Sequence, residues 1–189
     1  MLYLASASPR RQELLRQLGL RFDVIVPDVP ETPAPGEDAR AYVTRLARQK
    51  AERALALIRA RGLPEGAVLG ADTEVVLDGE ILGKPRDRAH GLAMLARLSG
   101  RTHEVLTAVC LLHQDARHEA LSESRVTFGP IAPADLERYW ETGEPVGKAG
   151  GYAIQGRAAA FIERIEGSYS GIVGLPLYEV AQLLKRVED

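Results

Sequence analysis

The chain has 189 residues, of which 46% are hydrophobic, so residues 1–189 are predicted to form a single domain with an ample core. The formal net charge of −2 does not favour non-specific binding to nucleic acid. The single cysteine excludes an intrachain disulfide and a cysteine zinc site. Without a membrane-length apolar stretch or a signal peptide, the sequence predicts a cytoplasmic protein with no membrane partner.

Two arginines mark the start of the first predicted helix. Residues 2–5 predict a strand, and Ser8 is a suitable N-cap for a helix that ends at Gly19. Arg10 and Arg11 oppose the helix macrodipole in the first turn, at a cost of about 0.3–1 kcal/mol each. Free N–H groups, serine hydroxyls and two arginines together indicate an anion site, with phosphate as the usual anion. The alternative is a pair of solvated surface arginines.

A lysine lies within the apolar face of the long second helix. Residues 22–26 alternate and predict a strand, and the acidic, proline-rich loop 28–36 contains Glu31. A helix then runs from residue 37 or 38 to about 61, with Lys50 inside its apolar stripe. Lys50 either extends to the rim or points into a cleft that holds an anion. The stripe by itself predicts that Lys50→Met leaves the fold intact or slightly more stable.

The central stretch brings an acid and a base close together. The apolar run 67–69 predicts a buried strand that ends at residues 70–71, which places Asp72 at the lip of a sheet, a common position for ligands. Asp78-Gly79 between apolar runs predicts a tight hairpin, which folds the chain back so that Lys84 can lie near Asp72. The alternative is a simple surface salt bridge.

The second half predicts more strands and helices around a glycine-rich loop. Helices are expected over 87–98, 133–142 (with Trp140 inward) and after Pro176, and strands over 105–112, 119–128 and 161–165. The buried face of the last helix is predicted to hold Leu177, Val180, Ala181, Leu184 and Val187. Residues 147–156 contain four glycines around Lys148 and Gln155. They suggest a backbone that approaches a ligand closely, although a bulged strand and turn is the favoured reading of this stretch alone.

Several motifs together resemble the Maf family of nucleoside triphosphate pyrophosphatases. The similarity covers essentially the whole chain, in the same order. The motifs are Ser6-x-Ser8-Pro9-Arg10-Arg11, Gly70-Ala71-Asp72-Thr73, Gly83-Lys84-Pro85, Lys148-Ala149-Gly150, Ile154-Gln155-Gly156, Gly167-Ser168-Tyr169 and Gly174-Leu175-Pro176.

The resemblance implies a fold, a reaction and a subfamily. The fold is mixed α/β, with a twisted central sheet, flanking helices and two lobes around a long cleft, often in a homodimer. The reaction cleaves a nucleoside triphosphate to the monophosphate and pyrophosphate with a divalent metal, Mg²⁺ or Mn²⁺. Pro9-Arg10, Asp72-Thr73 and Ile154-Gln155-Gly156 look like the dTTP/UTP type, because the 7-methyl-GTP type typically carries Asp-Gln and Glu-Gly at the latter two places.

The resemblance also implies roles for individual residues, and the residue chemistry agrees with them. Asp72 is the expected proton acceptor for the attacking water. The metal is expected on the carboxylates of Asp72 and Glu31, since Mg²⁺ prefers oxygen ligands. Base selection is expected from Arg10, Thr73 and Gln155. The phosphates are expected to contact Ser8, Arg11, Lys50, Lys84 and Lys148.

Two alternative functions remain open from the sequence. One is a pyrophosphatase for 7-methyl-GTP or for modified nucleotides, because a loose base pocket leaves no motif. The other is a nucleotide-binding regulator of septum formation that does not hydrolyse its ligand.

Overall fold

A mixed sheet forms the centre of the molecule. The computed structural model describes residues 1–187, and the last two residues of the predicted domain, 188–189, lie outside that range. The seven strands run in the order β2-β1-β3-β5-β6-β7, with β4 paired to β3 beyond this path. β1 is parallel to β2 and β3, and the other pairs are antiparallel. The strands are β1 (Leu2–Ala5), β2 (Asp23–Val24), β3 (Ala67–Leu77), β4 (Glu80–Ile81), β5 (Thr102–His113), β6 (Ala116–Phe128) and β7 (Ile162–Glu166).

Helices flank this sheet, and several begin at the caps that the sequence predicts. The side chains of Ser8, Asp38 and Asp87 each accept a hydrogen bond from a backbone N–H of the first helical turn. The α-helices are α1 (Pro9–Gln17), α2 (Ala39–Ala60), α3 (Arg88–Leu98), α4 (Pro133–Glu141), α5 (Tyr169–Val173) and α6 (Leu177–Lys185), and the 3₁₀ helices are η1 (Ala149–Gly151) and η2 (Arg157–Phe161).

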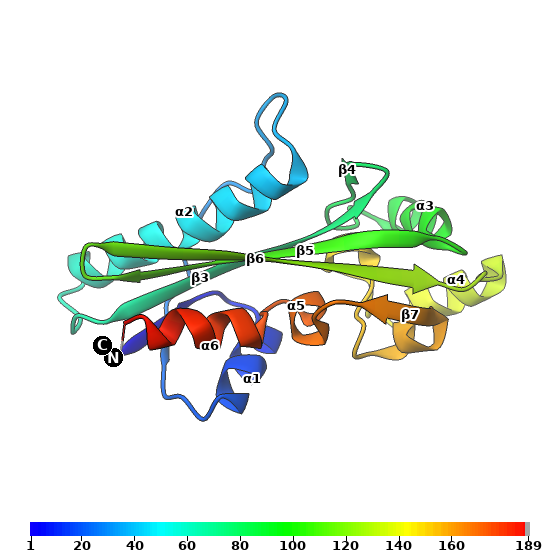
Figure 1. Ribbon diagram of the computed structural model, residues 1–189. Helices are drawn as coiled ribbons and strands as arrows, with labels where there is room; N and C mark the ends of the chain where they lie inside the picture. The colour runs from blue at the N-terminus through cyan, green and yellow to red at the C-terminus, as the bar shows by residue number, and fades with distance from the viewer. Residues whose placement is uncertain (188–189) are drawn as a thin grey trace.

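Two hydrophobic clusters cover the two faces of the sheet. α2 packs on one face through Val43, Ala47 and Ala51, and α1 and α6 lie on the other (Figure 1). α3, α4 and β7 lie toward one end of the long strands β5 and β6, and α1 and α6 lie toward the other end (Figure 1). The predicted mixed α/β fold, with a central sheet and flanking helices, is therefore confirmed.

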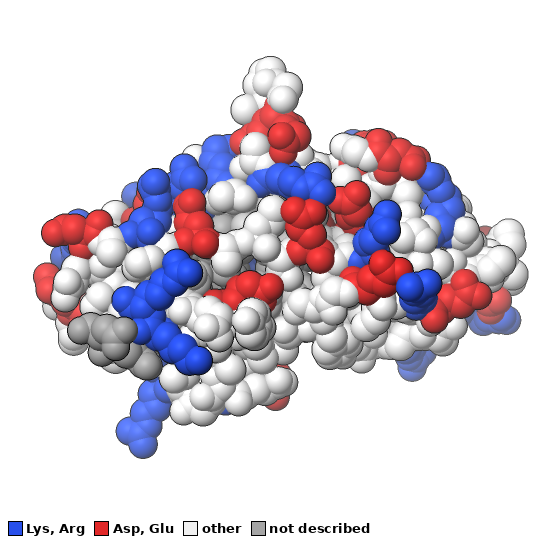
Figure 2. Space-filling view, viewed as in Figure 1, with Lys and Arg blue, Asp and Glu red and all other residues white. Residues whose placement is uncertain are grey.

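The molecular surface carries interspersed charges. Figure 2 shows Lys and Arg mixed with Asp and Glu over the face in view, rather than gathered into one basic patch. Within residues 1–187, no helix is both long enough and apolar enough to cross a membrane.

The predicted end of the central strand at residues 70–71 is wrong. β3 continues to Leu77, so Asp72 lies in the middle of a strand. The strand that ends near Gly70 is β1, the parallel neighbour of β3, which pairs with β3 only as far as Gly70. β4 pairs with the same edge of β3 only from Val76 onward. Between these two points β3 has β5 along one edge, and its other edge faces a cavity. The small size of Gly70, which suggested a strand end, allows close packing against α2 instead.

Several smaller predictions also differ from the structure. The second strand is confined to Asp23–Val24. Trp140 is only half-buried and lies against Gly91, where a Cβ atom would meet the indole at 2.0 Å. On α6, Val180 is buried as predicted, while the other predicted residues are half-buried and Leu183, which was not predicted, is buried.

The Asp78-Gly79 hairpin is confirmed, with both residues at positive φ as a type I′ turn requires.

Candidate active site

A cavity of about 290 Å³ opens beside the unpaired edge of β3. Every site residue predicted from the sequence lines it. Because side chains alternate along a strand, Asp72 and Glu74 lie on the α2 side of the sheet, while Thr73 faces α5. The cavity surrounds the open edge, so groups from both faces of the sheet meet in one space.

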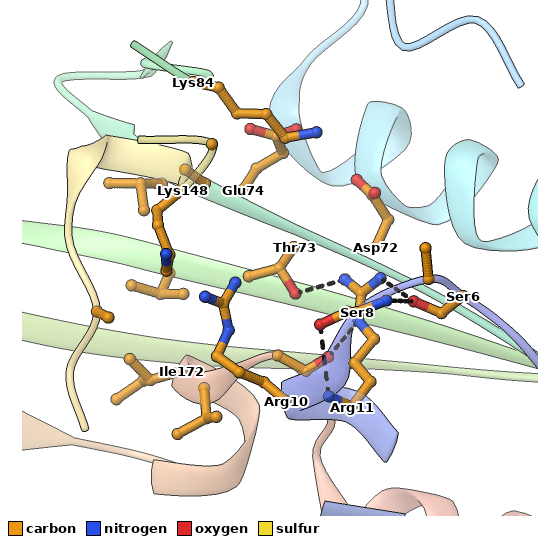
Figure 3. A pocket seen from close by; sticks show the side chains of 18 of the residues that line it. Ser6, Ser8, Arg10, Arg11, Asp72, Thr73, Glu74, Lys84, Lys148 and Ile172 are labelled. Carbon is orange, nitrogen blue, oxygen red and sulfur yellow. Dashed lines mark hydrogen bonds between the residues drawn. The ribbon is translucent and has the colours of Figure 1, made fainter. Parts of the chain in front are cut away.

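The first helical turn of α1 supplies a buried guanidinium. Ser8 Oγ accepts a hydrogen bond from the Arg11 N–H and caps the helix. The Arg11 side chain donates to the Gly174 carbonyl at 2.7 Å, Ser6 Oγ at 3.3 Å and Thr73 Oγ1 at 3.1 Å (Figure 3). These partners are neutral, and burial lowers the pKa of Arg11. The geometry leaves the positive charge uncompensated by direct contacts.

Two further cations face the same space. Arg10, from α1, and Lys148, from the glycine-rich segment, both point into the cavity and lie near each other (Figure 3). Burial lowers the pKa of both side chains, and the charge of Arg10 lowers that of Lys148 further. Among residues 1–187, no carboxylate forms an ion pair with Arg10, Arg11 or Lys148. Three convergent cations of this kind form a site for a polyvalent anion.

The opposite end of the cavity contains a chain of alternating charges. The Lys50 ammonium donates to Asp72 Oδ1 at 2.6 Å and to Glu31 Oε1 at 2.7 Å, and Lys84 donates to Glu31 Oε2 at 2.7 Å. Although burial acts to raise it, these two lysines lower the pKa of Glu31 to about 2. Within residues 1–187, Asp72 and Lys84 do not form the direct salt bridge that the sequence left open as an alternative. Glu31 and Lys50 link them.

A glycine permits the close contact between α2 and β3 that places Lys50. A Cβ atom on Gly70 would lie 2.3 Å from the Ala47 carbonyl oxygen and 2.7 Å from the Ala51 nitrogen. The helix backbone therefore packs directly on the strand. Lys50 extends from this contact to Asp72, which explains why a lysine is tolerated inside an apolar stripe.

Glu74 belongs to the site but was not predicted. It lines the cavity and is 9% exposed. Burial, together with the nearby Asp72 charge, raises its pKa to about 8. Glu74 Oε2 and Asp72 Oδ2 are buried and accept no hydrogen bond in the described residues. A continuous strand would have shown Glu74 two residues from Asp72 on the same face, but the assumed strand end hid this signal.

The predicted base-reading residues have unequal surroundings. Thr73 Oγ1 accepts a hydrogen bond from Arg11 and lies 3.0 Å from Thr107 Oγ1, whose single proton is donated to the Gly171 carbonyl at 2.7 Å. Thr73 thereby helps to orient Arg11. Gln155 is exposed at the cavity wall, where its amide is available to a ligand.

The glycine-rich segment attaches the Lys148 wall to the hairpin. Gly150 has a φ of +67°, and its N–H donates to the Gly83 carbonyl at 2.9 Å. A Cβ atom there would lie 2.9 Å from Val75 Cγ1. The close backbone approach is therefore made to β3 and the hairpin, and neighbouring residues of the segment line the cavity. The favoured reading of a bulged strand is wrong, because Ala149–Gly151 forms a 3₁₀ helix and residues 147–156 contain no strand.

Sequence comparisons agree with the motifs and the geometry. The family model described as Maf-like protein matches residues 1–187. A protein from Burkholderia pseudomallei (strain 1710b) is 57% identical, with 97% of this chain and 91% of that protein covered, and is named dTTP/UTP pyrophosphatase. A protein of the same name from Cupriavidus pinatubonensis is 55% identical, with 98% and 96% covered.

A third relative, from Bordetella avium, carries the same name and is 53% identical over 98% of this chain and 94% of its own length. A solved structure of a protein from Vibrio cholerae aligns with a TM-score of 0.36 and 13% identity over 74% of this chain and 68% of that one, which is too weak a similarity to argue from. The family match spans all the described residues and includes every motif in the cavity, so this chain belongs to the Maf-like protein family.

Proposed function

We propose that this protein hydrolyses dTTP and UTP to the monophosphate and pyrophosphate. The observation that carries this proposal is the cavity itself, in which three cations without carboxylate partners among residues 1–187 face a buried acid whose second oxygen has no partner there. The relatives named dTTP/UTP pyrophosphatase support the same substrate class. A nucleotide-pool activity of this kind belongs in the cytoplasm, and a homodimer stays a prediction of the family resemblance.

Asp72 has the geometry of a general base. Lys50 fixes one carboxylate oxygen, Oδ1, while Oδ2 is buried at the cavity without a partner. In the proposed reaction the Asp72 carboxylate accepts a proton from a water whose oxygen attacks the α-phosphorus. The bond from that phosphorus to the oxygen bridging to the β-phosphorus breaks, and pyrophosphate leaves with the bond's electron pair. Lys50 holds the Asp72 carboxylate in place for this purpose.

The cations divide into two groups with different tasks. Within residues 1–187, Arg11 and Lys148 pair with no carboxylate and can bind phosphate oxygens at once, while Arg10, which also has no carboxylate partner there, is left for the base. Phosphoryl transfer depends mainly on positioning and charge stabilisation, and both follow from fixed cations in a partly closed site. Lys84 is exposed and reaches the phosphates by exchanging Glu31 for a phosphate oxygen.

The donor set fits a divalent metal. Mg²⁺ and Mn²⁺ take oxygen ligands, commonly one or two carboxylates together with substrate phosphates. The buried, unpartnered Asp72 Oδ2 provides such a ligand. No group of three or more His, Cys, Asp and Glu side chains within residues 1–187 is arranged to hold an ion alone, so phosphate oxygens would complete the coordination. When bound, the metal would supply neutralising charge at the transferring phosphoryl group.

The base is proposed to be read by Arg10, Thr73 and Gln155. The glutamine amide can donate to O4 of uracil or thymine and accept the N3–H, whereas an arginine can only donate. A rotated amide would match cytosine equally well, which makes CTP the most informative competitor. A mismatched base leaves buried polar groups unpaired at about 1–3 kcal/mol each.

A nucleotide panel with product analysis tests the proposal. The nucleotides are dTTP, UTP, CTP, ATP, GTP and 7-methyl-GTP. We expect kcat/KM for dTTP and UTP to exceed that for the purine nucleotides at least about tenfold, with pyrophosphate and not orthophosphate released. A preference for 7-methyl-GTP or a modified nucleotide would contradict the subfamily. Nucleotide binding without pyrophosphate release over hours would favour a non-hydrolysing regulator.

A further inference from the structure

Two carboxylates occupy neighbouring positions on one face of β3. Asp72 and Glu74 are two residues apart, which places their Cα atoms roughly 6.6 Å apart along the strand with both side chains on the α2 side. They are 5% and 9% exposed, and both reach the cavity (Figure 3). Two acids this deeply buried and this close are costly unless something positive lies between them.

Each of these side chains has an oxygen with no partner. Lys50 takes Asp72 Oδ1 and leaves Oδ2, and Glu74 Oε2 is likewise buried without a hydrogen bond within residues 1–187. Buried carboxylate oxygens without partners are rare in folded proteins and call for a bound ion or water to explain them. The two free oxygens are on the same strand face and line the same cavity.

Glu31, which the sequence suggested as a metal ligand, is in a different state. Both of its oxygens already accept hydrogen bonds from lysine ammonium groups, at 2.7 Å each, and its side chain is 38% exposed. The Lys50 ammonium lies between Glu31 and Asp72, within hydrogen-bond distance of both. A divalent cation bridging Glu31 and Asp72 would have to displace this ammonium or bear its repulsion.

We propose that Glu74, and not Glu31, is the second protein carboxylate of the divalent-metal site, acting together with Asp72. The proposal rests on the proposed pyrophosphatase function, which requires such a metal. Glu31 then has a positioning role, because it holds Lys50 and Lys84 at the cavity mouth. Glu74 lies outside the motifs that carry the family resemblance, so the assignment concerns this chain and not the family pattern.

Direct binding of Mn²⁺ tests this assignment without turnover. Free Mn²⁺ is measured by electron paramagnetic resonance during titration of the full chain, with a UTP analogue whose α,β-bridging oxygen is replaced by CH₂. Loss of even an outer-shell partner typically weakens metal affinity 10–100-fold, so we expect Glu74→Gln to weaken Mn²⁺ binding at least about tenfold. Asp72→Asn should do the same, and the double variant should lose little more, because both changes remove one site.

Three further variants serve as comparisons. Glu31→Gln should weaken Mn²⁺ binding much less than Glu74→Gln. Glu80→Gln makes the same chemical change at an exposed residue paired with Arg97 outside the cavity, and should bind Mn²⁺ like the wild type. Glu74→Asp keeps a carboxylate and should retain part of the affinity, which separates a ligand role from a purely structural one. Melting temperatures measured without metal show that each variant is folded.

The outcomes separate the proposal from its alternatives. Unchanged Mn²⁺ affinity in Glu74→Gln would overturn it, as would a larger loss in Glu31→Gln or a wild type that binds no Mn²⁺ beside the analogue. Since the titration contains no hydrolysable nucleotide, failure of the pyrophosphatase function would appear only in product analysis. A Glu74-dependent metal site without pyrophosphate release would leave this assignment standing while the proposed function fails.

Discussion

The Lys50 ammonium on α2 lies 2.6 Å from the Asp72 carboxylate on β3, and the two side chains are only 12% and 7% exposed. This ion pair crosses the contact between helix and sheet, so it belongs to both the fold and the site. The apolar stripe alone predicts that Lys50→Met leaves the fold intact or slightly more stable. The ion pair reverses that expectation, because the variant leaves a buried carboxylate without its cation.

We therefore expect Lys50→Met to lower the free energy of unfolding by about 3 kcal/mol and to weaken nucleotide binding. The double variant Lys50→Met/Asp72→Asn should recover part of this loss, since no uncompensated charge is left. Lys185→Met, at an exposed residue of α6, is the matched control and should change little. Urea unfolding measures all three, and a fully stable Lys50→Met protein would show that the pair contributes nothing.

Gly70 is required for the helix–strand contact. In Gly70→Ala the new methyl group would meet the α2 backbone, so α2 and Lys50 must shift. Overpacking of this kind costs about 1–3 kcal/mol, and we expect kcat to fall as Lys50 moves away from Asp72. Gly129→Ala is the control, because its Cβ would have no neighbour closer than 3.9 Å. Equal stability and turnover of the two variants would refute the packing argument.

Gln155→Glu tests the reading of the base. A carboxylate at this exposed cavity position repels O4 of uracil and thymine and cannot donate to it. We expect the ratio of kcat/KM for UTP to that for GTP to fall at least about tenfold. Gln114→Glu adds the same charge at an exposed turn away from the cavity and should leave the ratio unchanged. An unchanged ranking in Gln155→Glu would remove this residue from base selection.

His103 makes the fold sensitive to acid. It is 2% exposed, its Nε2 lies 2.7 Å from the Tyr152 hydroxyl, and burial lowers its pKa to about 4. The unfolded chain binds a proton near pH 6.5 and the folded chain does not, so stability falls as the pH drops from 6.5 toward 4. Between pH 7 and pH 5 the free energy of unfolding should fall by about 2 kcal/mol on account of His103. The His103→Gln variant should lack this loss. Parallel pH profiles of the two proteins would contradict it.

The parts of the fold that depend on local signals were predictable from the sequence. The capped start of α1 at Ser8, the Asp78-Gly79 turn and the long α2 follow from hydrogen bonding and backbone conformation within a few residues. The cavity residues were found because their motifs lie in one family pattern. Arg10 and Arg11 also indicate an anion site without the family pattern, because cations at the start of a helix are unfavourable unless an anion lies near them.

The parts that depend on contacts distant in sequence were not predictable. Gly70 was interpreted as a strand end, although its small size is required by α2, some twenty residues earlier in the chain. This error hid the pairing of Asp72 with Glu74 on one strand face. The ion-pair partners of Glu31 could not be predicted either, because no sequence pattern shows which lysines lie beside a carboxylate in a loop.

Asp72→Asn separates binding from chemistry. The amide is nearly isosteric but accepts a proton poorly, and loss of a positioned general base costs on the order of 10²-fold or more in rate. We expect kcat to fall by at least that factor, while the dissociation constant of the nonhydrolysable UTP analogue changes only a few-fold. The measurement is single-turnover hydrolysis beside calorimetric binding. More than half of the wild-type activity in the variant would make Asp72 structural.

Hydrolysis of UTP in water enriched in ¹⁸O tests the central claim most directly. If Asp72 activates water for attack at the α-phosphorus, mass spectrometry will find one ¹⁸O atom in UMP and none in the released pyrophosphate. Label in the pyrophosphate, or release of orthophosphate in its place, would place the attack at a different phosphorus and contradict the account.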